Sequence, residues 1–258
     1  MKHFEQIIHR VIEKAKNDTN IIGIGLAGSY ISNQIDKFSD LDFVIITEND
    51  YLFSKSEMVS FAESLENYVT GFIGDHVGEK TLLICLFENP ITHIDFKFTE
   101  IKNFISRIEN PLIVYEKSNR IDNIYKETVP IWPKPDLQWI EDRFWVWIHY
   151  SATKLGRNEF FETIDFISFL RLNVIGPLYH LKYNKDNRGI RKLEFFLDQN
   201  DLTQLKKTIP NYSYESIKNS ILELIEIYKN LRSHIFTSEI QINKKVESVA
   251  IDYLKNLE

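Results

Sequence analysis

The sequence predicts an α+β protein in which an α/β half is followed by an all-α half. Strand-like and helix-like patterns alternate over roughly the first 130 residues, whereas only helical patterns follow. Between the halves lies Trp132-Pro133-Lys134-Pro135, the one stretch where two prolines stand so close together. Because prolines interrupt both helices and strands, we predict two domains at residues 1–132 and 133–258.

The first half reads as a helix followed by a series of short strands. Apolar residues recur every three or four positions over residues 2–16, which predicts an amphipathic helix, and residues 53–67 repeat the pattern more weakly. The break at Glu88-Asn89-Pro90 separates two strand-like runs and predicts a β-hairpin. The apolar or alternating runs that are typical of strands are 21–27, 41–47, 81–87, 91–98 and 112–115.

The second half contains four long helical patterns. Residues 137–155 and 217–231 each carry one apolar stripe, as expected for amphipathic helices. Residues 159–182 are apolar nearly all round, so we expect this helix to lie at the centre of its domain. Residues 244–257 form the last predicted helix.

Composition excludes several classes of protein. With 258 residues, 43% of them apolar, and only 9 Gly and 7 Pro, the chain can bury a real core and has no long flexible linker. A formal net charge of −6 argues against a general nucleic-acid binder. The single cysteine, Cys85, lies in an apolar run and is interpreted as a packing residue rather than a nucleophile.

The chain shows no targeting or membrane-spanning pattern. Its N-terminal stretch is charged throughout, and no run approaches about 18 apolar residues. We therefore expect a cytoplasmic protein without a membrane partner, present as a monomer or homodimer.

The segment with most chemical information runs from Gly28-Ser29 to Asp40-Leu41-Asp42. Side chains alternate along a strand, so Asp40 and Asp42 share one face. Two such carboxylates repel each other unless a cation lies between them, and a hard divalent ion such as Mg²⁺ prefers oxygen ligands. A pair of acids by itself is also typical of a solvated strand edge.

Two further features favour a metal and phosphate site. Gly28-Ser29 ends a buried strand, where a glycine permits close approach and the following N–H groups and hydroxyl can cradle a phosphate. Downstream, His93, Asp95 and Lys97 share one face of a later strand, and Asp95 would complete a set of three carboxylates. His93 itself is interpreted as a strand-packing residue.

This pattern resembles the nucleotidyltransferase superfamily with the polymerase-β-like core, in which Gly-Ser, about ten residues, Asp-x-Asp and a third acid follow in order. The resemblance implies a nucleotidyltransferase domain with a mixed sheet, Asp40, Asp42 and Asp95 as catalytic residues and Mg²⁺ ligands, and nucleotide contacts from Gly28 and Ser29. The length and the helical second half are similar to the aminoglycoside and lincosamide adenylyltransferases, in which a helical domain closes one side of the drug site.

The second half offers candidate residues for nucleotide and acceptor binding. Lys154 to Glu159 resembles a Lys-x-x-Arg-Gly-acid stretch of the antibiotic enzymes, with Asn158 in place of the glycine. Lys154 is assigned to the nucleotide, and a solvated surface is the alternative. Asp165 stands among apolar neighbours and must be paired or face a cavity. The residues assigned to the acceptor are Trp147, Tyr150, Glu159 and Asp165.

The resemblance implies transfer of AMP from ATP, with Mg²⁺, to a hydroxyl of a small acceptor such as an aminoglycoside or lincosamide. Either Asp95 or Glu159 would take the proton of that hydroxyl. Two alternatives stay open. The same core can modify a protein or a nucleic-acid end, although the acidic charge argues against a nucleic-acid partner. Alternatively, the chain can be a non-catalytic regulatory binding protein.

Overall fold

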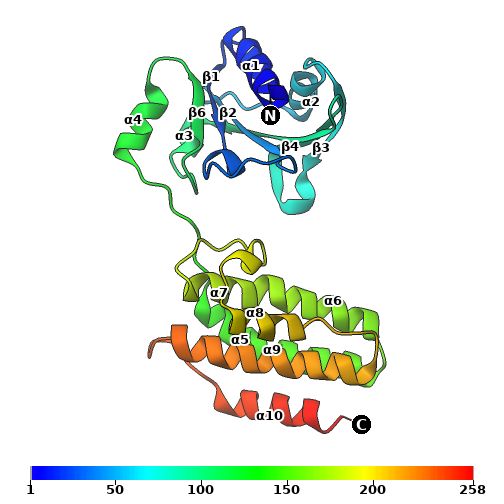
Figure 1. Ribbon diagram of the computed structural model, residues 1–258. Helices are drawn as coiled ribbons and strands as arrows, with labels where there is room; N and C mark the ends of the chain where they lie inside the picture. Colours follow the sequence, from blue (N-terminus) through cyan, green and yellow to red (C-terminus); the bar gives the residue numbers. More distant parts are fainter. Residues whose placement is uncertain (1, 258) are drawn as a thin grey trace. The chain divides into compact units, whose positions relative to one another are not determined.

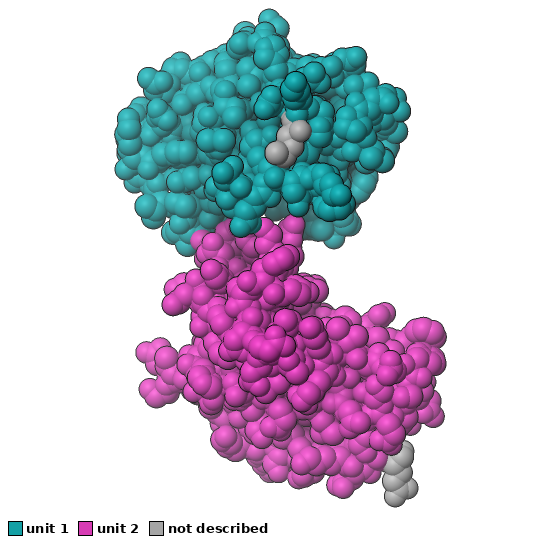
Figure 2. Space-filling view, in the orientation of Figure 1, with its two compact units in different colours: residues 1–131 teal, residues 132–258 magenta. Residues whose placement is uncertain are grey.

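The computed structural model describes residues 2–257. These residues fall into two compact units, unit 1 up to Ile131 and unit 2 from Trp132 (Figure 2). Unit 1 is built on a sheet with helices on it, and unit 2 is helical throughout (Figure 1). The α+β fold class predicted from the sequence is confirmed. Across residues 2–257, no helix combines the length and the apolar character that a membrane crossing requires.

The sheet of unit 1 has six strands in the order β3-β4-β5-β2-β1-β6. Neighbouring strands are antiparallel except β2 and β5, which are parallel, so the sheet is mixed as expected. The β4–β5 pair is the hairpin that the sequence predicts. The strands are β1 Ile21–Leu26, β2 Leu41–Thr47, β3 Tyr68–Gly74, β4 Glu79–Phe87, β5 Thr92–Glu100 and β6 Leu112–Glu116.

Helices cover one face of this sheet fully and the other only in part (Figure 1). On the covered face, α1 and α2 pack through Phe4, Val11 and Phe61 onto alternate strand residues. On the opposite face, α3 and α4 cover β1 and the end of β2 through Phe104 and Ile121. The helices of unit 1 are α1 Lys2–Lys16, α2 Lys55–Glu63, α3 Ile101–Phe104 and α4 Arg120–Glu127.

Unit 2 packs its helices around a core to which α5, α6, α7, α9 and α10 all contribute. The predicted helix over residues 159–182 is divided by a π-helical turn, Arg171–Ile175. Only its second part is central, because Val174 to His180 are all buried, whereas Phe161 is 76% exposed and Leu172 is 48% exposed. The helices are α5 Leu137–Gly156, α6 Phe160–Leu170, α7 Gly176–Lys182, α8 Gln199–Lys207, α9 Tyr214–Ile235 and α10 Lys244–Lys255.

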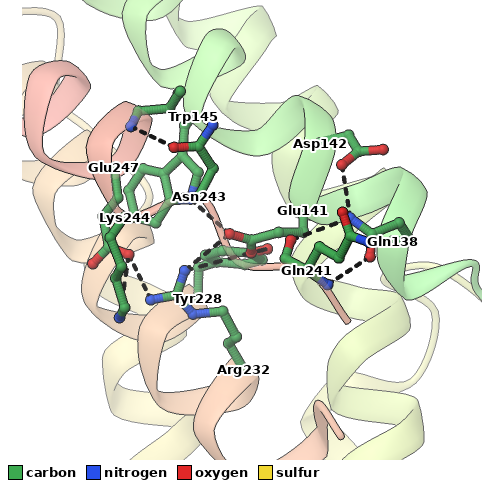
Figure 3. Close-up of polar contacts among 11 residues, drawn as sticks. Gln138, Glu141, Asp142, Trp145, Tyr228, Arg232, Gln241, Asn243, Lys244 and Glu247 are labelled. Carbon is green, nitrogen blue, oxygen red and sulfur yellow. Dashed lines mark hydrogen bonds and ion pairs between the residues drawn. The ribbon is translucent and has the colours of Figure 1, made fainter. Parts of the chain in front are cut away.

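A buried charge network ties α5, α9 and α10 together (Figure 3). The guanidinium of Arg232 donates to Glu141 Oε1 at 3.1 Å and to Glu247 Oε2 at 2.7 Å. Tyr228 and Trp145 donate to the same Glu141 carboxylate at 2.5 and 3.2 Å. The side chains of Glu141 and Arg232 are only 1% and 7% exposed. Because a buried charge is costly without a partner, this network joins three helices through mutually dependent contacts.

Candidate functional site

The polar residues singled out in unit 1 gather where β2 and β5 run side by side. Asp42 and Asp95 are direct cross-strand partners in the parallel register. Asp40 immediately precedes β2, and its charge is close enough to act on Asp95. The side chains of β5 alternate as predicted: Ile94 and Phe96 are buried, whereas Asp95 lies on the other, partly open face. The backbone therefore places the three predicted acids at neighbouring positions where β2 and β5 meet.

Burial gives Asp95 unusual acid–base properties. Loss of water around the side chain raises the pKa of Asp95, and the negative charge of Asp40 raises it further. A hydrogen bond from His93 Nε2 to Asp95 Oδ1, at 2.7 Å, lowers this pKa in part. The prediction that His93 is a strand-packing residue is therefore wrong, because its side chain is 51% exposed and contacts Asp95. The alternation of β5 had placed both side chains on one face.

Gly28 and Ser29 form a tight turn against Asp42. The chain leaves β1 into a short 3-10 turn, Gly28–Tyr30, and Gly28 takes the left-handed conformation with φ of +60°. A Cβ atom on Gly28 would stand 2.1 Å from Asp42 Oδ2, so only glycine fits this position. The Ser29 hydroxyl is buried and has no hydrogen-bond partner among the described residues. A sealed, unsatisfied hydroxyl is costly and is typical of a site where a ligand supplies the missing partner.

The chemistry of this donor set fits a hard divalent cation. Three carboxylates offer only oxygen atoms, the ligands that Mg²⁺ prefers. Over residues 2–257, however, no three His, Cys, Asp or Glu side chains are gathered closely enough to hold a metal ion. The backbone places the three acids together, and the assignment of Asp40, Asp42 and Asp95 as metal ligands stays a prediction.

The Cys85 side chain lies on the opposite face of the sheet from Asp95. Its thiol is buried, and burial raises its pKa to about 12. A thiol that keeps its proton at neutral pH is a poor nucleophile. The structure confirms the interpretation of Cys85 as a packing residue.

A second polar cluster lies in unit 2, where α5 meets α6. Lys154 Nζ is 2.8 Å from Glu159 Oε2 and 3.1 Å from Glu162 Oε2, and both contacts raise the pKa of Lys154. Tyr150 donates its hydroxyl proton to Glu162 as well. Three of the predicted residues therefore lie together. The sequence analysis did not identify Glu162. It contacts Tyr150 from a different helix, and no local sequence pattern predicts a contact between α5 and α6.

The stretch between these helices depends on Asn158. This residue has φ of +60°, a conformation that asparagine tolerates better than most residues. Asn158 can thus form the turn that a glycine would form, and it brings Glu159 back towards Lys154.

Two other predicted residues of unit 2 stand apart from this cluster. Trp147 is half-buried and packs edge-on against Trp139 and Phe169, each with ring centres 5.3 Å away. The prediction that Asp165 must be paired or face a cavity is wrong, because Asp165 is exposed. The adjacent Ile164 and Phe166 pack against the core of unit 2, and Arg171, the suggested partner, donates to Thr208 and Ser168 instead.

A cavity of about 460 Å³ in unit 2 lies at the start of α5. It is lined by Asp136, Trp139, Leu172, Asn173 and the backbone of Gly189, among others. None of the residues predicted from the sequence to bind nucleotide or acceptor lines it.

Comparisons with known proteins give a family match over nearly the whole chain and weaker structural likenesses. The family model described as streptomycin adenylyltransferase matches residues 1–257. The crystal structure of an aminoglycoside 6-adenyltransferase from Bacillus subtilis is 16% identical, with 98% of both chains covered and a TM-score of 0.42. A nucleotidyltransferase-like protein from Exiguobacterium sibiricum is 8% identical, with 98% of this chain and 89% of that chain covered and a TM-score of 0.39. No curated protein matches the chain.

Proposed function

Because the chain belongs to the streptomycin adenylyltransferase family, we propose that it transfers AMP from ATP to a hydroxyl of a small antibiotic-like acceptor. Family membership makes it an adenylyltransferase, which leaves the non-catalytic alternative without support. The nucleotide, the metal and the acceptor are parts of the proposal. The same-core alternatives, a protein or a nucleic-acid end, have no feature of the described residues in their favour.

One observation carries the proposal: the Gly28 turn lies against the Asp42 carboxylate, Asp95 lies opposite Asp42, and the next residue, Ser29, has a buried hydroxyl without a hydrogen-bond partner among the described residues. A triphosphate matches this arrangement, because its oxygens accept hydrogen bonds from Ser29 and from backbone N–H groups near Gly28. Its negative charge next to Asp42 and Asp95 would be repulsive without a cation. Asp40, Asp42 and Asp95 would hold Mg²⁺, which when bound neutralises charge on the phosphates as pyrophosphate leaves.

The residues of the chain supply positioning and proton transfer. The acceptor oxygen forms a bond to the α-phosphorus, and the bond from that phosphorus to the pyrophosphate oxygen breaks. The acceptor hydroxyl loses its proton to a carboxylate, and Asp95, which lies opposite Asp42, takes this proton if it does not complete the metal site. Glu159 is the competing base.

For unit 2 we propose a part in nucleotide and acceptor binding. Lys154 contributes a positive charge for the nucleotide, and Tyr150 offers an exposed aromatic ring beside it. Glu159 offers a carboxylate to a cationic acceptor, as does the exposed Asp165, while Trp147 supports the aromatic surface. Lys154 is held by two glutamates, so a bound phosphate would compete with them for it.

The proposal is tested with the full chain, ATP and Mg²⁺ against a panel of aminoglycosides, lincosamides, an oligonucleotide and protein lysate. We expect pyrophosphate release that depends on a small-molecule acceptor, with a product that carries AMP by mass spectrometry. Release with the oligonucleotide or the lysate only would overturn the small-molecule assignment.

Gly28→Ala is expected to lower kcat/KM by about 100-fold or more. The added Cβ would stand 2.1 Å from Asp42 Oδ2, so the carboxylate must move, and displacements of this size at a catalytic group cost about that much. Gly78→Ala is the matched control, because Gly78 also has positive φ but no atom lies within 4 Å of the added Cβ. An equal loss of kcat/KM in the two variants would show that backbone strain, and not contact with Asp42, causes the loss.

Glu159→Gln is expected to raise the acceptor KM about tenfold for a polycationic acceptor, with less effect at high salt, because salt screens a charge that is 37% exposed. Glu226→Gln, on an exposed carboxylate of α9, is the control. A collapse of kcat with an unchanged KM would instead assign proton removal to Glu159. An unchanged kcat/KM in both Glu159→Gln and Asp165→Asn would contradict a role of these residues in acceptor recognition.

A further inference from the structure

A row of four side chains crosses the partly open face of the unit 1 sheet. Asp42 on β2 pairs with Asp95 on β5, Asp95 pairs with Ile84 on β4, and Ile84 pairs with Phe72 on β3. Residues directly opposite each other in register project to the same face. The two carboxylates therefore continue sideways into two apolar side chains.

These apolar side chains belong to a larger patch on β3 and β4. Phe72 is 54% exposed, and the three β4 residues that alternate with the buried ones are half-buried. None of the four packs into the apolar cores of the described residues. We call this patch the shelf, and it consists of Phe72, Leu82, Ile84 and Leu86.

The direction of the reaction decides what lies over the shelf. In phosphoryl-type transfer the attacking and leaving oxygens stand roughly in line on opposite sides of the phosphorus. Gly28 and Ser29 follow β1, on one side of β2, whereas β5 and the shelf lie on the other side. If the leaving pyrophosphate lies over the Gly28 turn, the attacking hydroxyl comes from the side of Asp95 and the shelf.

We propose that the shelf is one subsite for the acceptor and takes a ring-shaped, hydroxylated molecule by its apolar C–H face. This inference rests on the proposed function. The hydroxyl reaches Asp95 while the ring lies over Ile84 and Phe72. Strands are about 4.8 Å apart, so Asp95 and Phe72 are separated by about 10 Å, which suits a molecule of one or two rings.

The charges around the shelf are compatible with such an acceptor. Lys97 is opposite Leu82 in the register, and its ammonium is paired with Glu79. Because Glu79 balances the charge of Lys97, this lysine does not repel an acceptor that carries amines. Specificity then divides between the apolar shelf, which selects the face of the ring, and Asp95, which selects the hydroxyl.

The test compares Phe72→Ala and Phe72→Leu in the full chain. With an acceptor that supports pyrophosphate release, Phe72→Ala is expected to raise the acceptor KM about tenfold and to leave the ATP KM unchanged, because the apolar contact is to the acceptor only. Phe72→Leu keeps an apolar side chain and should restore most of the affinity. Val129→Ala removes an apolar side chain that is 75% exposed on a segment after α4, and it serves as the control.

Direct binding of the same compounds, measured by calorimetry, separates this inference from the proposed function. Turnover with an unchanged acceptor KM in Phe72→Ala, or with an equal rise in the ATP KM, overturns the shelf alone. Binding that weakens in Phe72→Ala, without turnover in the wild-type chain, supports the shelf and overturns the proposed function. Neither binding nor turnover with any compound overturns both.

Discussion

Asp42→Asn is expected to abolish adenylyl transfer while the fold stays intact. The variant removes a charged oxygen that the proposed Mg²⁺ site needs, and loss of several kcal/mol of charge stabilisation corresponds to about 10³-fold or more in rate. Stability should not fall, because Asp42 lies opposite Asp95 and asparagine relieves the repulsion between them. Steady-state rates and thermal unfolding measure both effects.

The control for Asp42→Asn is Asp122→Asn, which neutralises an exposed aspartate on α4. It should leave the rate unchanged. Mg²⁺ with ATP should also raise the melting temperature of the wild-type chain, and ATP with a chelator should not, because only a ligand that binds the folded state stabilises it. More than about a tenth of the wild-type rate in Asp42→Asn, which is less than 1.4 kcal/mol of lost stabilisation, would contradict the metal assignment.

Arg232→Met is expected to destabilise unit 2 by about 3–5 kcal/mol, since it leaves the buried carboxylate of Glu141 without its cation. All four tryptophans of the chain lie in unit 2, so tryptophan fluorescence during urea unfolding reports on this unit. Lys229→Met on the same helix is the control. Lys229 is 39% exposed and 3.7 Å from Glu226, and such surface pairs contribute about 1 kcal/mol or less.

A double variant gives a second readout of the Arg232→Met effect. A buried carboxylate that has lost its cation is costly, and an uncharged amide of the same shape removes that cost. Adding Glu141→Gln to Arg232→Met should recover part of the loss at neutral pH. If Arg232→Met lowers the free energy of unfolding no more than Lys229→Met does, the network is not a coupled unit.

Much of the fold follows from local patterns in the sequence. Strands β1, β2, β4 and β5 and helices α1, α5 and α10 all occur where apolar periodicity predicts them, and the family inferred from Gly28, Ser29 and the acids is confirmed. Strand β3 was missed because it contains two glycines and a bulge between Tyr68 and Thr70, which together break the alternation. Such irregularities are set by pairing with β4, not by local preference.

The candidate site shows where local reasoning ends. Alternation correctly places Asp95 with His93 on one face of β5, but only the register shows that Asp95 stands opposite Asp42. The error at Asp165 has the opposite origin. Its neighbours are apolar, yet one residue of a helix is 100° from the next, so an acid among apolar residues can still face water.

The parallel pairing of β2 with β5 also bears on how the site forms during folding. Asp42 and Asp95 are 53 residues apart in the chain, and the loop between them must close before they meet. The β4–β5 hairpin is local and can form early, whereas pairing across such a separation is slow. A slip of one residue in this pairing would turn Asp95 towards the core under α1 and α2. Catalytic competence should therefore appear only with the last cooperative step of unit 1, so recovery of activity after refolding reports that step directly.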